Sequence, residues 1–515
     1  MARVLGLLCL LHSFAPLLAE DGAVVFVVDP SWDCVESYVA HVPLLQKYKI
    51  VKVMTRLGTA PPCNMGRADI YRNFTFNSAT PNDSAAAEGI CPELLSLGVP
   101  VRAVIPTHDP AVYLADRLAV CVGVRGNPFE GPLAKARRDK WVMGEAVRKA
   151  GLRAVHEKVV STWGEAKAYL QSLDPPLSPA NPVIFKILEG SSSEGVNKVY
   201  SLGQAEARWR IFSSDTSGDN HFGDSIKKLL IQEFLQGDEY VIDSVSRDGV
   251  HKVVTVWNEE LHPGNGVLDL YYGFKAMDPK DHKIQAIIEY ANKVLDATGL
   301  QNGASDMEVF WLEEEGRPCV VDLNGRWTAL MWHDGLALEQ ETVGNNQITA
   351  TINAYLDGDA FDDMPLVPSM KQHGAILFTM ARQTGFLRDT PGLAVAKKLP
   401  SYWGSYNDGM FVGTLIDKLP TSHPCLFILL AHRQKAVVDE DYDRIIGLEN
   451  SGAWFDIVQS PGNTSLAALR SNVDGLPGQR LPAIAALAML AAAAVFTLFA
   501  MSMQKVRDDT EYLAI

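Results

Sequence analysis

The sequence predicts a multidomain protein of mixed α/β and α+β class, with a secretory signal at one end and a single membrane span at the other. Three observations indicate this class. Strand and helix patterns alternate from residue 23 onward, a long central region consists mostly of strands, and a charge-free apolar run lies near the C-terminus. At 515 residues, with 47% apolar and 21% charged residues, the chain has a globular composition and the length of several compact units.

The N-terminal residues 1–19 fit a secretory signal peptide, because one basic residue precedes an apolar run that ends in a small residue. Residues 20–130 follow as an α/β domain. The patterns predict buried strands at residues 23–28, 50–54 and 101–105, helices at residues 32–48 and 111–120, and an irregular insertion at residues 56–89.

The central region, residues 131–360, begins with an expected helix at residues 132–150, which Gly151 ends. Strands dominate the remainder. The clearest helix is residues 281–297, because its apolar residues recur at helical spacing and Gly299 lies just beyond its end.

A hairpin in this region carries two opposed carboxylates. Two strands, Gly303–Leu312 and residues 319–323, flank a polar turn, and a symmetric turn places Glu308 directly opposite Asp322. Like charges at opposed positions destabilise a sheet, so their presence suggests a cation between them. Asn324 falls on the same face by period-two alternation, and Arg326 continues that face. These oxygen ligands suit Mg²⁺ or Mn²⁺.

A second group of residues suggests phosphate binding. Lys186 lies in an apolar strand, where unpaired lysines are rare, and a loop of small residues from Gly190 to Gly195 follows it. Backbone N–H groups of such loops can approach phosphate oxygens closely, and a lysine adds a compact positive charge. A further strand ends at Gln232-Glu233-Phe234-Leu235.

This ordering resembles the ATP-grasp superfamily and, within it, the carboxylate–amine ligases that join amino acids. The resemblance covers about residues 29–455, nearly all of the part expected to be lumenal, and implies a preceding α/β domain, an ATP-grasp domain and a C-terminal α+β lobe at residues 361–459. It implies ATP and Mg²⁺ as cofactors. The implied nucleotide-binding residues are Lys140, Lys186, Gly190, Ser191, Ser192, Gly195, Gln232, Glu233, Phe234, Leu235 and Glu239, and the implied metal ligands are Glu308, Asp322 and Asn324.

The chemistry implied by this resemblance is ATP-dependent formation of an amide or peptide bond through an acyl phosphate, with small carboxylate and amine substrates such as amino acids. Lys186 and Arg326 are the expected catalytic residues, with Arg326 stabilising the acyl phosphate and the tetrahedral oxyanion. Two alternatives remain open. One is a kinase on the same fold, and the other is a non-catalytic receptor that binds ATP or a metabolite.

The C-terminal part predicts membrane attachment. Residues 460–480 form a linker rich in small and polar residues, residues 481–504 form a charge-free run long enough to cross a bilayer, and residues 505–515 form a short tail. With the signal peptide, this predicts a single-pass type I protein with a lumenal or extracellular catalytic part. Asn73, Asn82 and Asn463 begin glycosylation sequons.

Charge and cysteines give weaker indications about partners. The net charge of −15 argues against a nucleic-acid partner, which normally requires a basic patch. A homodimer is compatible with the sequence but nothing in it requires one. Cys63 and Cys91 flank part of the insertion and could form a disulfide, whereas Cys121 and Cys319 lie in apolar runs and are expected to be buried thiols.

Overall fold

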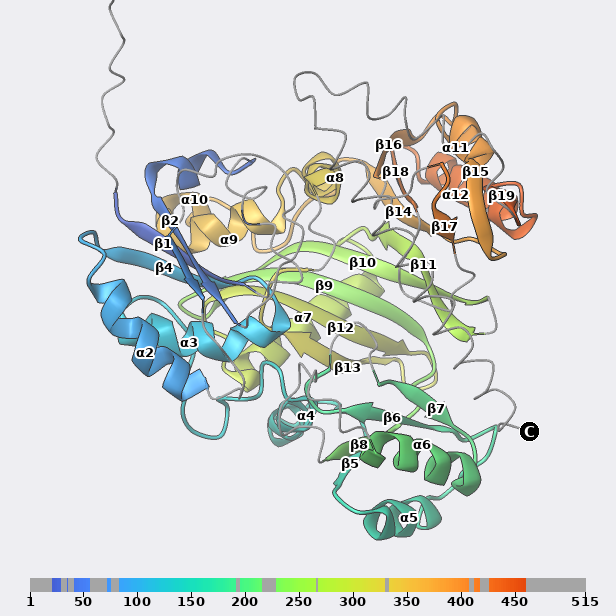
Figure 1. Ribbon diagram of the computed structural model, residues 1–515, viewed down its shortest axis with the longest axis horizontal. Helices are drawn as coiled ribbons and strands as arrows, with labels where there is room; N and C mark the ends of the chain where they lie inside the picture. The colour runs from blue at the N-terminus through green and yellow to red at the C-terminus, as the bar shows by residue number, and fades with distance from the viewer. Residues whose placement is uncertain are drawn as a thin grey trace, which may run out of the picture. The chain divides into compact units, whose positions relative to one another are not determined.

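The computed structural model describes most of the chain between residues 21 and 459 and divides it into two compact units (Figure 1). The smaller unit contains a three-stranded sheet of order β17-β15-β19, formed by Leu415–Ile416, Gly385–Asp389 and Asp456–Val458. The larger unit holds every other element. The described residues are 21–28, 35, 41–55, 72–75, 83–190, 195–214, 228–264, 267–328, 333–406, 412–416 and 426–459.

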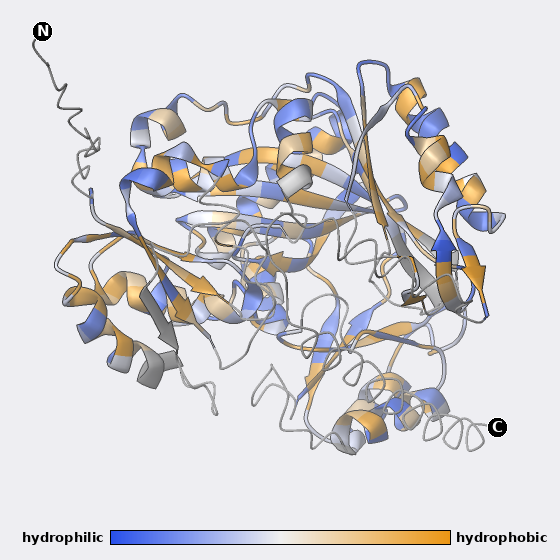
Figure 2. Ribbon diagram, turned by 45° about the horizontal axis from the view of Figure 1, so that its top comes forward, coloured by the Kyte–Doolittle hydropathy of each residue, from blue (hydrophilic) through white to orange (hydrophobic). Residues whose placement is uncertain are grey.

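The N-terminal layer of the larger unit is a parallel sheet of order β3-β2-β1-β4. Its strands are β1 Ala23–Val28, β2 Lys49–Met54, β3 Arg72–Thr75 and β4 Val101–Pro106. Every residue of β1 is buried, because both faces of the strand are covered, and the N-terminal strands are largely hydrophobic in Figure 2. Helices α2 Asp83–Leu95 and α3 Val112–Cys121 cover one face, and α9 Gln347–Leu356 packs on the other.

Several expected boundaries in the first 150 residues were wrong. The expected irregular insertion contains β3, which pairs with β2, and the start of α2, so Asn73 lies in a strand rather than a loop. The helix expected from residue 132 begins only at Lys140, as α4 Lys140–Lys149. Asp139 sets this start because its side chain accepts a 3.1 Å hydrogen bond from the Val142 amide, as an N-cap does.

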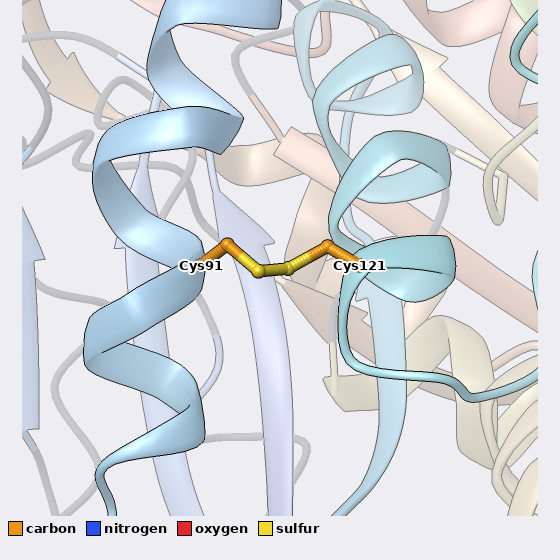
Figure 3. Close-up of a disulfide and its surroundings, with 2 residues drawn as sticks. All are labelled: Cys91 and Cys121. Atoms are coloured by element: carbon orange, nitrogen blue, oxygen red, sulfur yellow. A yellow bond between two sulfur atoms is a disulfide. The ribbon is translucent and has the colours of Figure 1, made fainter.

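The expected pairing of cysteines was also wrong. Cys91 on α2 is bonded to Cys121 on α3, with a Cα–Cα distance of 6.2 Å (Figure 3). Cys121 is therefore not the buried thiol that its apolar surroundings suggested, and Cys63 lies outside the described residues. Cys319 is a buried free thiol, as expected.

The central layer is an eight-stranded sheet of order β13-β12-β9-β10-β11-β14-β18-β16. Helix α7 His282–Thr298 covers one face through Ile284, Ile287 and Leu295. Asp281, the expected first residue of this helix, is its N-cap, and Gly299, which was expected just beyond its end, terminates it in the left-handed conformation. The strands are β9 Asp238–Arg247, β10 Val250–Gly264, β11 Val267–Ala276, β12 Gly303–Leu312, β13 Arg317–Asn324, β14 His373–Thr379, β16 Tyr402–Tyr406 and β18 Leu426–His432.

A third sheet, of order β5-β8-β6-β7, carries the residues expected to bind the nucleotide. Its strands are β5 Glu157–Val160, β6 Val183–Ile187, β7 Asn197–Val199 and β8 Leu229–Glu233. Helices α5 Trp163–Gln171 and α6 Leu202–Ser214 lie on one face of it (Figure 1). The remaining helices are the 3₁₀ segments Pro43–Lys47 and Asp109–Ala111, and α8 His333–Val343, α10 Gly358–Asp362, α11 Pro391–Ala396 and α12 Lys435–Asn450.

The membrane prediction requires correction. In the stretches of chain that the structure describes, no helix combines the length and apolar character needed to cross a bilayer. This finding contradicts the expected single-pass type I localisation with a lumenal or extracellular catalytic part. Residues 1–19 and 481–504, where the signal peptide and the span were expected, lie outside the described residues.

Candidate active site

The two carboxylates of the hairpin lie opposite each other, as the sequence predicted. Glu308 on β12 pairs in register with Asp322 on β13, and Asp306 pairs with Asn324. The alternating residues Met307 and Leu323 pack into the apolar core beneath α7, so the polar residues occupy the opposite face of the sheet. The backbone thus collects acidic and amide oxygens on one surface.

The geometry of this surface shows electrostatic strain between the acids. Burial raises the pKa of Glu308 well above its usual value, and the nearby charges of Asp322 and Glu239 raise it further. Lys140 relieves part of this repulsion, since its Nζ lies 2.8 Å from Asp322 Oδ2. The pKa of Glu308 nevertheless stays raised, so the repulsion is not fully relieved. A cation at this surface would therefore be stabilised by the carboxylates that face each other.

Lys140 connects the hairpin to the loop of small residues. It is the first residue of α4, its side chain is buried, and its Nζ also donates a 2.9 Å hydrogen bond to the carbonyl of Gly190. Gly195, at the far end of this loop, has a φ of +71°, a left-handed conformation that favours glycine. Ser191 and Ser192 lie outside the described residues.

Lys186 approaches the same surface from β6. Its side chain is buried, and its Nζ lies 3.5 Å from the carbonyl oxygen of Val321, next to Asp322. Burial lowers the pKa of Lys186 to about 8, and the positive charge of Lys140 contributes to the shift, while Asp322 and Glu308 oppose it. Three elements far apart in the chain therefore bring two lysines to the paired carboxylates.

The four residues from Gln232 to Leu235, expected to bind the nucleotide, are placed by separate contacts at the end of β8. Glu233 accepts hydrogen bonds of 2.7 Å each from the Arg153 guanidinium and the His156 amide. Leu235 is buried, and Lys198 Nζ lies 3.4 Å from the centre of the Phe234 ring. Gln232 is also buried and donates to a carboxylate on β5.

Glu239 lies at the start of β9, beside a carboxylate that the sequence analysis missed. Glu239 pairs with Glu259 of β10, which is 8% exposed. Burial raises the pKa of Glu259 well above its usual value, with Glu239 and Glu308 adding repulsion. The available signal was Glu259 itself, an acid within the strand pattern of β10, but its partner could be identified only once the β9–β10 register was known.

Arg326 is held by two buried carboxylates. Its guanidinium lies 3.1 Å from each carboxylate oxygen of Asp109 and 2.5 Å from Asp306 Oδ2. Burial alone would raise the pKa of Asp109, but the nearby charges of Arg326, Arg138 and His108, with the hydrogen bonds from Arg326, together outweigh it and hold the pKa at about 2. These partners anchor the residue, and a role of Arg326 in stabilising reaction intermediates stays a prediction.

The donor set suits a hard cation that completes its coordination with ligand oxygens. Within the described ranges, no three His, Cys, Asp or Glu side chains are grouped in a way that could hold a metal ion. The expected set contains only two such side chains, Glu308 and Asp322, with the amide oxygen of Asn324. Mg²⁺ is commonly bound through one or two carboxylates together with substrate phosphates, so these residues fit it.

Comparison with known proteins identifies the domain that carries most of these residues. Residues 180–332 match a family model described as "ATP-grasp domain". This segment of the chain therefore carries an ATP-grasp domain. The ATP-grasp part of the predicted fold is confirmed, and the predicted cofactors, ATP and Mg²⁺, agree with the nucleotide and magnesium named for solved structures of this fold.

Curated relatives match part of the chain. "Dapdiamide A synthase" of Enterobacter agglomerans is 25% identical over 257 residues, which is 50% of this chain and 57% of the relative. "Alanine--anticapsin ligase" of Bacillus amyloliquefaciens is 23% identical over 291 residues, with 52% and 57% of the two chains covered. The chain thus spans a little over half the length of these relatives.

Solved structures share the fold over a longer range. An L-amino acid ligase from Bacillus licheniformis has a TM-score of 0.62 at 16% identity, covering 86% of this chain and 99% of its own. An N5-carboxyaminoimidazole synthase from Aspergillus clavatus, in complex with ADP and a ribonucleotide, has a TM-score of 0.57 at 13% identity, covering 84% and 99%.

Proposed function

We propose that this ATP-grasp protein is a Mg²⁺-dependent carboxylate–amine ligase that forms an amide or peptide bond and releases ADP and phosphate. One observation carries the proposal. Lys140 and Lys186 converge on the opposed carboxylates Glu308 and Asp322, a combination of charges suited to a metal–triphosphate complex. The curated relatives, whose names describe a synthase and a ligase, support the same reaction class.

Each group has a defined role in the proposed site. Glu308, Asp322 and Asn324 would hold Mg²⁺, which neutralises charge on the triphosphate when bound. Lys140 and Lys186 bind phosphate oxygens. The segment from Gln232 to Leu235 holds the base, and Glu239 accepts hydrogen bonds from the ribose hydroxyls.

The reaction then proceeds in two displacements. A substrate carboxylate oxygen attacks the γ-phosphorus, the bond to the ADP oxygen breaks, and an acyl phosphate forms. An amine next attacks the acyl carbon, loses a proton, and expels inorganic phosphate to leave the amide. The protein contributes mainly by positioning the reactants and by stabilising charge, with Lys186 beside the transferred phosphoryl group.

Amino acids are the proposed substrates. The relatives include an alanine ligase and an L-amino acid ligase, and both reacting groups, a carboxylate and an amine, occur together in amino acids. The two displacements require one carboxylate donor and one amine acceptor in each turnover. Pairs of amino acids should therefore be tested in both orders.

The test is ADP release by the full chain with Mg-ATP and pooled amino acids. We expect substrate-dependent ADP release that falls about a hundredfold or more in Glu308→Gln, which keeps the size of the side chain but removes its charge. Equal release of ADP and phosphate with a new amide supports a ligase. A phosphorylated product that persists with an amine present would show a kinase, and ATP binding without ADP release would contradict the proposed activity.

A further inference from the structure

The nucleotide-binding sheet contains a buried carboxylate for which the proposed reaction has no use. Glu157 is the first residue of β5, and its side chain is only 1% exposed. It pairs across the strands with Gln232 of β8, whose Nε2 donates a 2.5 Å hydrogen bond to Glu157 Oε2. The other oxygen, Oε1, is buried with no hydrogen bond, and its closest cationic partner is Arg148 at 3.8 Å.

This arrangement lowers the stability of the folded protein, so stability does not explain it. A buried carboxylate with one unsatisfied oxygen loses its hydration without full replacement by protein contacts. Burial accordingly raises the pKa of Glu157 to about 7, even though the hydrogen bond from Gln232 and the charge of Lys186 favour ionisation. A residue kept under these conditions calls for a function.

The backbone of α4 also accommodates this carboxylate. Gly144 lies in the interior of α4, where glycine is a poor helix former. A Cβ atom at this position would collide with Glu157 Oε1, so the absent side chain leaves the room that the carboxylate occupies. Gly144 therefore lowers the intrinsic stability of α4 at the position where the helix contacts Glu157.

The strand register connects Glu157 to the proposed phosphate site. Gln232 pairs with Ile184 of β6, and Lys186 lies two residues further along that strand. By alternation, Glu157, Gln232 and Lys186 share one face of the sheet, whereas Phe185 and Ile231 point into the apolar core on the other face. The carboxylate therefore lies on the same sheet face as Lys186, which belongs to the proposed phosphate site.

We propose that Glu157 is a positioning residue that fixes the carboxamide of Gln232 and thereby selects adenine. Because Gln232 Nε2 is used to donate to Glu157, the amide oxygen is the group left to accept a hydrogen bond. Adenine presents an exocyclic N–H donor, whereas guanine presents a carbonyl oxygen at the same ring position. This inference rests on the proposed ATP site and concerns its choice of base.

Equilibrium binding of ATP and GTP to the full chain tests the inference. In Glu157→Gln, the residue at 157 can donate or accept, so the Gln232 amide is free to rotate. We expect roughly tenfold weaker ATP binding, the effect of losing one buried charge-assisted hydrogen bond, and a smaller preference for ATP over GTP. Gly144→Ala should change binding in the same direction, because it displaces the carboxylate without altering any charge.

A reciprocal exchange provides the sharper control. The double variant Glu157→Gln with Gln232→Glu restores one carboxylate and one amide in the pair, and we expect it to recover most of the ATP affinity. Thermal unfolding confirms that each variant is folded. Unchanged ATP affinity in both Glu157→Gln and Gly144→Ala, or an exchange variant as weak as Glu157→Gln, overturns the inference. Wild-type protein that binds ATP but releases no ADP counts against the ligase proposal alone.

Discussion

Two clusters of buried charge lie on the central sheet, and they differ in how completely their charges are matched. In the first, the Arg326 guanidinium contacts Asp109 and Asp306, and Arg138 lies 4.0 Å from Asp109; the pKa of Asp109 is held at about 2, whereas burial still raises the pKa of Asp306. In the second, Lys140 contacts Asp322, but Glu308 faces that same acid and has a strongly raised pKa. The matched cluster is suited to hold structure, whereas the unmatched cluster is suited to receive a charged ligand.

The largest expected effect concerns the matched cluster. Arg326→Met leaves two buried carboxylates without their cation, so the free energy of unfolding should fall by about 3–5 kcal/mol. Urea denaturation measures the change. Arg326→Lys, which keeps the charge but loses the planar two-pronged geometry, should give an intermediate loss. A full loss of ADP release in Arg326→Met with unchanged stability would assign the residue to the substrate and remove the distinction between the clusters.

The contrast between the clusters also shows what the sequence could predict. The opposed Glu308 and Asp322 were predictable because a symmetric turn fixes the register of a hairpin locally, and α7 was predictable from its apolar period and its end signals. The contact between Arg326 and Asp109 was not predictable, since the two residues are 217 positions apart in the chain. Local patterns determine strands, helices and hairpins, but they carry no information about which distant side chains meet.

The same limit applies to residues whose neighbours come from other elements. The hydrogen bond between Glu157 and Gln232 joins residues that are 75 positions apart. The pairing of Cys91 with Cys121 depends on α2 and α3 packing together, which the sequence analysis missed because it treated the start of α2 as an irregular insertion. The register of Glu308 with Asp322 was thus predictable from a contiguous hairpin, whereas the partners that tertiary packing brings together were not.

A smaller effect is expected for the covalent link in the N-terminal layer, which also contains Asp109. Cys121→Ser should lower the free energy of unfolding by about 2–4 kcal/mol, because it releases a 30-residue constraint on the unfolded chain. Adding a reductant to the wild-type protein should reproduce the loss, and reductant should have no further effect on the variant. If the loss exceeds that of Arg326→Met, the disulfide rather than the matched charge cluster dominates the stability of this layer.

The pH dependence of stability tests Glu157, a buried acid outside both clusters whose pKa is raised, in contrast to Asp109, whose pKa is lowered. The pKa of Glu157 is raised from 4.5 to about 7 by burial, against the opposing effects of Gln232, Lys186 and Arg148. Its stabilising protonated form is fully present below pH 4.5, and the contribution is lost as pH rises through 7. Between pH 5 and 8 we expect wild-type protein to lose about 1–3 kcal/mol relative to Glu157→Gln, measured by denaturation at each pH. Parallel curves for the two proteins would show that Glu157 is ionised throughout.

The smallest effect on stability is expected for the unmatched cluster, where it has the opposite sign. At a pH high enough to ionise Glu308, Glu308→Gln removes a like charge from opposite Asp322, so the protein without ligands should gain a few tenths to about 1 kcal/mol in its free energy of unfolding. Binding of Mg-ATP should reverse this difference and make the wild-type protein more stable than Glu308→Gln. Mg-ATP raises the melting temperature of a protein only if it binds the folded state, and wild type should respond much more strongly than the variant. Asp306→Asn is the matched control, because it removes a partner of Arg326 and should lower stability without ligands. If Glu308→Gln also lowers stability, Glu308 belongs with the matched charges and the repulsion between the paired carboxylates has no role in ligand binding.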